Sequence, residues 1–123
     1  MIRRISLTIV TCLAILLFAL PAWATLTSIH TSGATAYYNS ATDRAGIEDT
    51  LTDGASVKVE WCLTTSTSKS NCTGLGVKSF TNSSGAGVLL DGSQIVPGSN
   101  TRIIFRACRN VYGNCSGWVN TSF

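Results

Sequence analysis

The stretch SVKVEWCLT, residues 56–64, decides the fold. Apolar and other side chains alternate along it: the apolar set is Val57, Val59, Trp61 and Leu63, and the other is Lys58, Glu60 and Cys62. Such alternation predicts a β-strand with one buried and one wet face. β-Branched residues at this density, with no helix cap before them, disfavour a helix.

A second strong strand is expected over residues 100–109. Ile103, Phe105 and Ala107 share its buried face, whereas its other face carries Arg102, Ile104, Arg106 and Cys108. Five shorter candidate strands, separated by turn sequences, are residues 34–38, 47–51, 77–80, 88–91 and 116–123. About seven short strands without a helical pattern predict an all-β fold. We expect a small antiparallel β-sandwich, with a small β-barrel as the alternative.

The chain opens with the features of an export leader. Arg3 and Arg4 precede an almost unbroken apolar run over residues 5–20, and Ala22 and Ala24 then form a small-x-small cleavage motif. We therefore expect a signal peptide over residues 1–24 and a secreted, extracellular product. Removing these 24 of 123 residues leaves 99, enough for one domain. We expect residues 34–123 to form that β-sandwich domain, after a flexible arm or edge strand over residues 25–33.

Four cysteines follow the leader, namely Cys62, Cys72, Cys108 and Cys115. Export favours disulfides over metal binding or redox catalysis. In both strong strands the cysteine shares a face with charged residues, which argues against a bridge through the core. We expect local disulfides, Cys62–Cys72 and Cys108–Cys115, with a bridge between neighbouring strands, Cys62–Cys108, as the rival. Their spacing differs from the short pairs of zinc sites, so we expect no metal site.

The composition offers little for catalysis. His30 is the single histidine, oxidised cysteines supply no thiolate, and no glycine-rich phosphate loop opens a helix. We therefore predict no catalytic residue, no cofactor and no enzyme activity. Without Arg3 and Arg4, seven basic residues face six acidic ones, a net charge of about +1. With no basic stripe, neither nucleic acid nor, after leader cleavage, a membrane is an expected partner.

Three surfaces are candidates for binding another secreted protein. The wet face of the second strand carries Arg102, Ile104 and Arg106, an arginine and apolar mixture typical of interfaces, beside Lys58 and Glu60 if the two strong strands are neighbours. The segment 109–116, closed by its disulfide, contains Arg109 and Tyr112 and precedes Trp118. The 25–33 arm, with Leu26 and Ile29, could add a strand to a partner's sheet. Core packing is nevertheless the default expectation for Trp118, and a mixed-charge sheet face with cross-strand pairs is the default for the first surface.

The segments 53–61, 105–108 and 115–118 (Asp-Gly-Ala-Ser-Val-Lys-Val-Glu-Trp, Phe-Arg-Ala-Cys and Cys-Ser-Gly-Trp) resemble small secreted four-cysteine β-rich proteins of actinobacteria, most of which have no assigned function. The resemblance spans about residues 50–119. It implies export and a β fold, and it implies no catalytic residues. It also allows a non-catalytic subunit or adaptor of a larger extracellular, toxin-type assembly.

The leading functional expectation is therefore a secreted, non-catalytic protein-binding module. One alternative is a secreted inhibitor of an extracellular protease that presents the loop from Arg109 to Ser116, with Arg109 as the specificity residue. The other is a carbohydrate-binding protein or small hydrolase that uses Glu60 and exposed aromatic residues.

Overall fold

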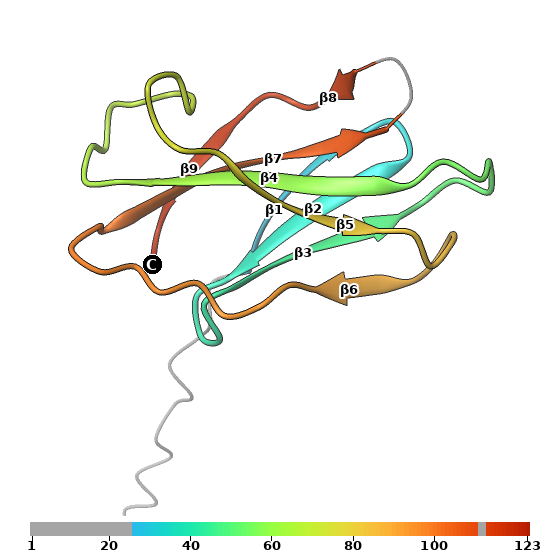
Figure 1. Cartoon of the computed structure of the whole chain (residues 1–123), viewed down its shortest axis with the longest axis horizontal. Coiled ribbons are helices and arrows are strands. Elements are labelled where there is room, and N and C mark those ends of the chain that lie inside the picture. The colour runs from blue at the N-terminus through green and yellow to red at the C-terminus, as the bar shows by residue number, and fades with distance from the viewer. Residues whose placement is uncertain (1–25, 111–112) are drawn as a thin grey trace, which may run out of the picture.

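The computed structural model describes residues 26–110 and 113–123. Within them the chain forms only β-strands (Figure 1). The strands are β1 (Leu26–Thr31), β2 (Ala34–Asn39), β3 (Arg44–Asp49), β4 (Val57–Thr64), β5 (Lys78–Asn82), β6 (Leu89–Asp91), β7 (Arg102–Arg109), β8 (Asn114–Cys115) and β9 (Val119–Ser122). The leader, residues 1–24, and Tyr112 lie outside the described residues.

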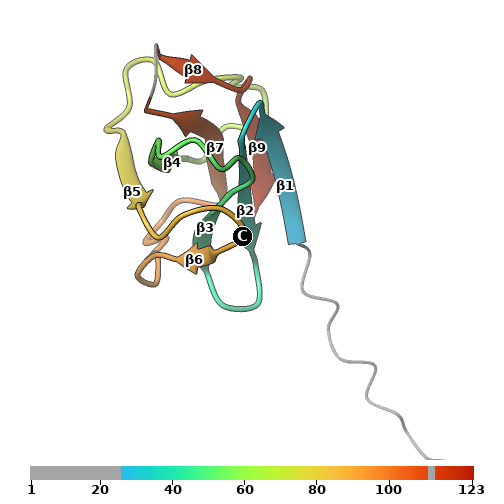
Figure 2. The same ribbon diagram turned by 90° about the vertical axis from the view of Figure 1, so that its right-hand side faces the viewer.

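Two antiparallel sheets pack face to face. The first sheet has the order β1-β2-β3-β6; the second has the order β5-β4-β7-β8, and β9 pairs with β7 beside β8. The view along the layers shows the two sheets as separate, with β1 of the first sheet close to β9 of the second (Figure 2). A hydroxyl pair, Thr27 Oγ1 and Thr121 Oγ1 at 3.4 Å, joins these two strands. The predicted sandwich is confirmed, and the chain is not a closed barrel.

The alternating pattern of β4 and β7 fills the core as predicted. Val57 and Val59 from β4, and Ile103, Phe105 and Ala107 from β7, are all fully buried. Tyr38 of β2 faces them from the other sheet, with its ring centroid 6.4 Å from that of Phe105 and 5.7 Å from that of Phe123. These aromatic contacts join the two sheets through the middle of the sandwich.

Two local predictions need correction. The strand expected at 47–51 is Arg44–Asp49, because Ala45 and Gly46 pair with β2, and Leu51 is exposed. Two strands are present beyond the expected seven: β1 and the two-residue β8. Of the two alternatives expected for the 25–33 segment, the structure has the edge strand, over Leu26–Thr31 and in register with all six residues of β2.

Candidate binding site

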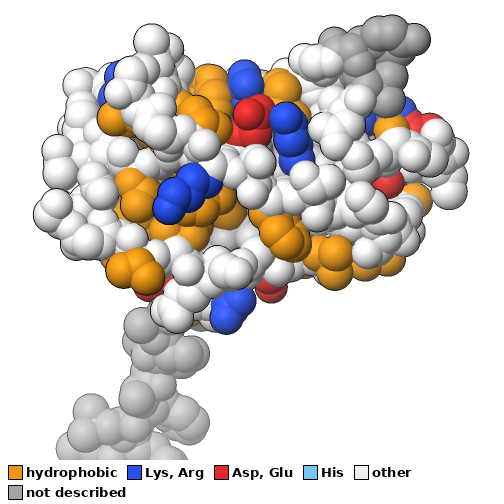
Figure 3. All heavy atoms as spheres, in the orientation of Figure 1, with side chains coloured by type: hydrophobic (Ala, Val, Ile, Leu, Met, Phe, Trp, Pro, Cys, Tyr) orange, Lys and Arg blue, Asp and Glu red, His pale blue; other side chains and the backbone are white. Residues whose placement is uncertain are grey.

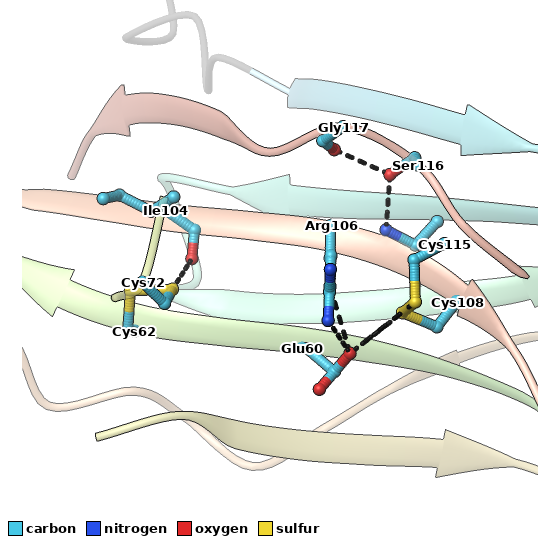
Figure 4. A network of polar contacts seen from close by, with 10 residues as sticks. Glu60, Cys62, Cys72, Ile104, Arg106, Cys108, Cys115, Ser116 and Gly117 are labelled. Carbon is cyan, nitrogen blue, oxygen red and sulfur yellow. Dashed lines mark hydrogen bonds and ion pairs between the residues drawn. A yellow bond between two sulfur atoms is a disulfide. The ribbon is translucent and has the colours of Figure 1, made fainter. Parts of the chain in front are cut away.

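The two strong strands are neighbours, so Lys58 and Glu60 do lie beside Arg106 on the outer side of the second sheet. β4 and β7 pair antiparallel over eight positions, with Glu60 opposite Arg106 and Lys58 opposite Cys108. Glu60 Oε1 accepts from Arg106 Nη2 at 2.9 Å and from Arg106 Nε at 3.1 Å (Figure 4). The Arg106 guanidinium carbon also lies 4.2 Å from the centroid of the Trp118 ring. Arg106 is therefore held between a carboxylate and an indole.

Ile104 does not lie on an exposed patch, and that prediction is wrong. Its side chain is fully buried in a small cluster with Cys62 and Cys72, covered by Leu75 and Trp118. The disulfide Cys62–Cys72 holds the segment after β4 against the outer face of the sheet. A position that alternation assigns to solvent thus becomes part of a second, smaller core.

The other predicted binding residues are largely engaged within the molecule. Arg102 Nε donates to Asn120 Oδ1 at 2.6 Å, and the Arg109 guanidinium pairs with the Asp53 carboxylate. The Arg109 side chain is only 18% exposed, so it does not project into solvent as a residue presented to a partner would. Trp118 is half-buried on the outer face, neither in the main core nor free.

The 25–33 segment also differs from a free arm. Ile29 packs against the main core, whereas Leu26 is 59% exposed at the start of β1. His30 is exposed on the same strand. An exposed apolar residue at a sheet edge keeps this segment a candidate contact, but only as part of a paired strand.

Both local disulfides are present. Cys62 joins Cys72, and Cys108 joins Cys115, its direct cross-strand partner. The rival Cys62–Cys108 bridge is wrong, because the register places Cys62 opposite Ile104 and not opposite Cys108.

The second disulfide lies in a hollow of about 400 Å³ that includes Glu60, Lys58 and Arg106. Glu60 Oε1 is 2.9 Å from Cys108 Sγ and 3.8 Å from Cys115 Sγ. Glu60 and the two cysteines form a group of metal-ligand type in the described part of the chain. Sulfur atoms bonded to each other carry no thiolate, however, and Arg106 already neutralises Glu60. In the oxidised protein these residues form a structural network.

Another hollow, of about 620 Å³, lies between residues 51–56 and 83–86. Its two carboxylates are already engaged. Asp49 Oδ1 accepts from the Leu51 amide at 3.0 Å, and Asp53 holds both the Ala55 amide and Arg109. In the described part of the chain no aromatic residue lines this hollow, so it offers a ligand little apolar contact area.

A third hollow, which the sequence did not reveal, has a better lining. It is a groove of about 380 Å³ between β5 and the segment 92–96 that follows β6. We call it the edge groove; its lining includes Trp61, Lys78, Phe80, Ile95 and Val96. Lys78 Nζ lies 5.3 Å from the centroid of the Trp61 ring. On this side of the molecule hydrophobic side chains surround a basic one (Figure 3).

The backbone that forms the groove is fixed by hydrogen bonds. The Ile95 amide donates to the Asp43 carbonyl at 2.7 Å, and the Gly92 amide donates to the Ala45 carbonyl at 2.9 Å. Arg44 Nη1 donates to the Gly92 carbonyl at 2.8 Å. Phe80 packs so closely on Gly92 that a Cβ there would lie 3.2 Å from its ring. The groove is therefore formed before any ligand arrives.

The alternating pattern of β4 explains why the sequence did not predict this groove. Alternation assigns Trp61 to the buried face, and Trp61 does point to that side of the sheet, packing on the core. β5, however, is the last strand of the sheet, so the inner face beside Trp61 stays partly open. Val96, 80% exposed, has no periodic pattern around it that would mark it as a rim residue.

No known protein family, curated protein or solved structure matches this chain. In residues 26–110 and 113–123 no helix is long and apolar enough to cross a membrane.

Proposed function

We propose that this protein is a non-catalytic binding module, secreted to an oxidising compartment, that holds a partner protein at the edge groove. The observation that carries the proposal is the lining of that groove: two aromatic rings, an 80% exposed valine on the rim and a single charged residue, Lys78. Interface cores share this combination of aromatic anchors and few charges.

The disposition of the ionisable groups supports a binding role over a catalytic one. Glu60, the strand carboxylate considered for hydrolysis, is paired with Arg106 and only 15% exposed. A general acid or base needs access to a substrate proton. The two disulfides support an extracellular location, because such bonds persist in oxidising compartments.

A role as a subunit or adaptor of a larger extracellular assembly is the finer form of this proposal. Such a role needs only a stable body and a contact surface, and two disulfides in a domain of about 100 residues supply the first. The edge groove supplies the second.

The two alternatives have weaker support. A protease inhibitor with Arg109 as its specificity residue would have to insert that side chain into the protease's pocket. The Arg109 side chain, however, is paired with Asp53 and mostly buried. A sugar ligand would stack on an open aromatic face, yet Lys78 lies over one face of Trp61, and Arg106 lies over Trp118.

Affinity capture with paired variants tests the proposal. The oxidised protein is immobilised and exposed to the culture medium of the producing organism, and the retained protein is identified by mass spectrometry. Val96→Asp should abolish its retention, because a charge on the groove rim opposes burial. Leu26→Asp is the matched control, an equal change at an exposed apolar residue of β1, and it should retain the partner.

The same pair of variants separates the two surfaces. If Leu26→Asp loses the partner and Val96→Asp retains it, the contact lies on β1 and not at the edge groove. If both variants retain the partner as well as the parent protein does, the edge groove is excluded as the contact.

A further inference from the structure

The edge groove runs beside an unpaired sheet edge. β5 pairs with β4 on one side and with no strand of the described chain on the other. No backbone hydrogen bond joins it to the 92–96 segment across the groove. A terminal strand of this kind presents unpaired amide and carbonyl groups along its free side. An extended segment of another chain can satisfy these groups by adding a strand.

Lys78, at the start of β5, restricts what can pair there. It is exposed, it is the one charged residue of the groove lining, and it forms no ion pair within the described residues. Its contact with Trp61 keeps the ammonium group at the groove. A lysine on a sheet edge opposes indiscriminate strand pairing, because an incoming apolar chain would bury its charge. A partner carboxylate at that position removes the penalty.

The register of β5 sets the spacing of the partner's side chains. Lys78 and Phe80 are two residues apart and face the same side of the strand, opposite Trp61 and Val59 of β4. Partner residues that lie opposite them on an added strand are therefore also two positions apart. One should be acidic, to meet Lys78, and the other apolar, to fill the groove between Phe80 and Val96.

We propose that the edge groove binds an extended segment of a partner protein, which adds as a strand to β5 and places an acidic side chain against Lys78 and an apolar one against Phe80. In antiparallel pairing the order along the partner is apolar-x-acidic, and in parallel pairing it is acidic-x-apolar. β5 has five residues, so the paired segment is about five residues, or roughly 17 Å, long. This inference rests on the proposed function and specifies the ligand of the same site.

Selection from a displayed library of random nine-residue peptides tests the inference, with the oxidised full domain as the bait. The selected peptides should share an acidic and an apolar residue two positions apart. A synthetic peptide with that consensus is then titrated by fluorescence anisotropy. Lys78→Glu should weaken its binding about tenfold or more and favour the peptide with lysine at the acidic position. Lys69→Glu, the same charge change in the segment between β4 and β5, should alter neither affinity by more than about twofold.

Backbone methylation tests strand addition separately from charge. In an added strand only every second residue directs its amide toward β5. N-methylation of those residues should abolish binding, whereas N-methylation of the intervening residues should leave it almost unchanged. Lys78 and Val96 are exposed, so circular dichroism of their variants should match the parent and exclude unfolding as the cause.

The outcomes separate this inference from the proposed function. If the library yields no binder, no shared acidic residue or no alternation in methylation sensitivity, strand addition is wrong. If Val96→Asp still abolishes capture of the protein partner in that case, the edge groove remains the contact and the partner meets it with a folded surface. If Val96→Asp has no effect on capture while consensus peptides bind as expected, the proposed protein contact fails but the peptide site stands.

Discussion

Asn82, at the end of β5, should be among the most important polar residues for stability. It is fully buried, and its Nδ2 donates to the Ile47 carbonyl at 3.0 Å and to the Val88 carbonyl at 2.7 Å. Its Oδ1 accepts from the Ser84 amide at 2.9 Å. One side chain therefore ties the last strand of the second sheet to β3 of the first and closes the turn that follows.

Replacement by alanine removes three hydrogen bonds and leaves their backbone partners with poor access to water. At about 1 kcal/mol for each bond, and somewhat more for a buried group left unpaired, Asn82→Ala should lower the free energy of unfolding by about 3–4 kcal/mol. In a domain of this size that corresponds to a melting temperature lower by roughly 15–25 °C. Urea unfolding, followed by circular dichroism, measures the loss directly.

Two further variants make the measurement specific. Ser83→Ala, at the exposed neighbouring position, should change stability by less than about 0.5 kcal/mol. Asn82→Asp keeps the shape but turns a carboxylate toward two carbonyls, which raises the pKa of the new carboxyl in the folded state. The protonated form is then favoured by folding, so this variant should be most stable below about pH 4 and lose stability as the pH rises. An alanine variant within 1 kcal/mol of the parent, or an aspartate variant without this pH dependence, would refute the reasoning.

Three more outcomes follow from buried groups and are measured by the same unfolding assay. Ile104→Ala should lower the free energy of unfolding by about 2–4 kcal/mol, because the side chain is fully buried. A change near zero would instead indicate that Ile104 lies on an exposed patch. Replacing Cys62 and Cys72 together by alanine should lower the free energy of unfolding by about 2–3 kcal/mol for a loop of this length. An unchanged midpoint of urea unfolding would contradict a stabilising disulfide. Burial, aided by the hydrogen bond to Asp43, raises the pKa of Tyr38 well above its usual range. Since the folded pKa exceeds the unfolded value of about 10, stability should be full below that pH and decline above it, and Tyr38→Phe should flatten this decline above about pH 10.

Alternation predicted well what the two longest strands, β4 and β7, contribute to the main core. The buried residues of β4 and β7 required only that each strand has one face toward another sheet. The same rule failed for Ile104, whose cover comes from a segment that is distant along the chain and held by a disulfide. Local pattern carries no information about such cover. The position of a cysteine on the outer face gave the pairing but not the fact that its loop folds back over the strand.

Asn82 and Trp61 show the same limit from opposite directions. Asn82 belongs to a sequence typical of a turn, yet tertiary packing buries it completely. Trp61 belongs to the apolar set of the best strand, yet it lies beside the open edge of its sheet. Strand order decides both cases, since only the neighbours in space determine whether a side chain is covered. The sequence predicts which strands form better than it predicts which strand is last in a sheet.

The disulfides also bear on where a partner can approach. One holds the segment that covers Ile104, and the sulfur atoms of the other lie against Glu60, which is paired with Arg106. Glu60, Arg106 and Ile104 are thus engaged within the molecule, so a partner would have to displace existing contacts to use them. β5 lies at the opposite margin of the sheet from β8, and its free edge and the edge groove remain available. Covalent stabilisation of one face and recognition at the other margin are then two consequences of the same strand order.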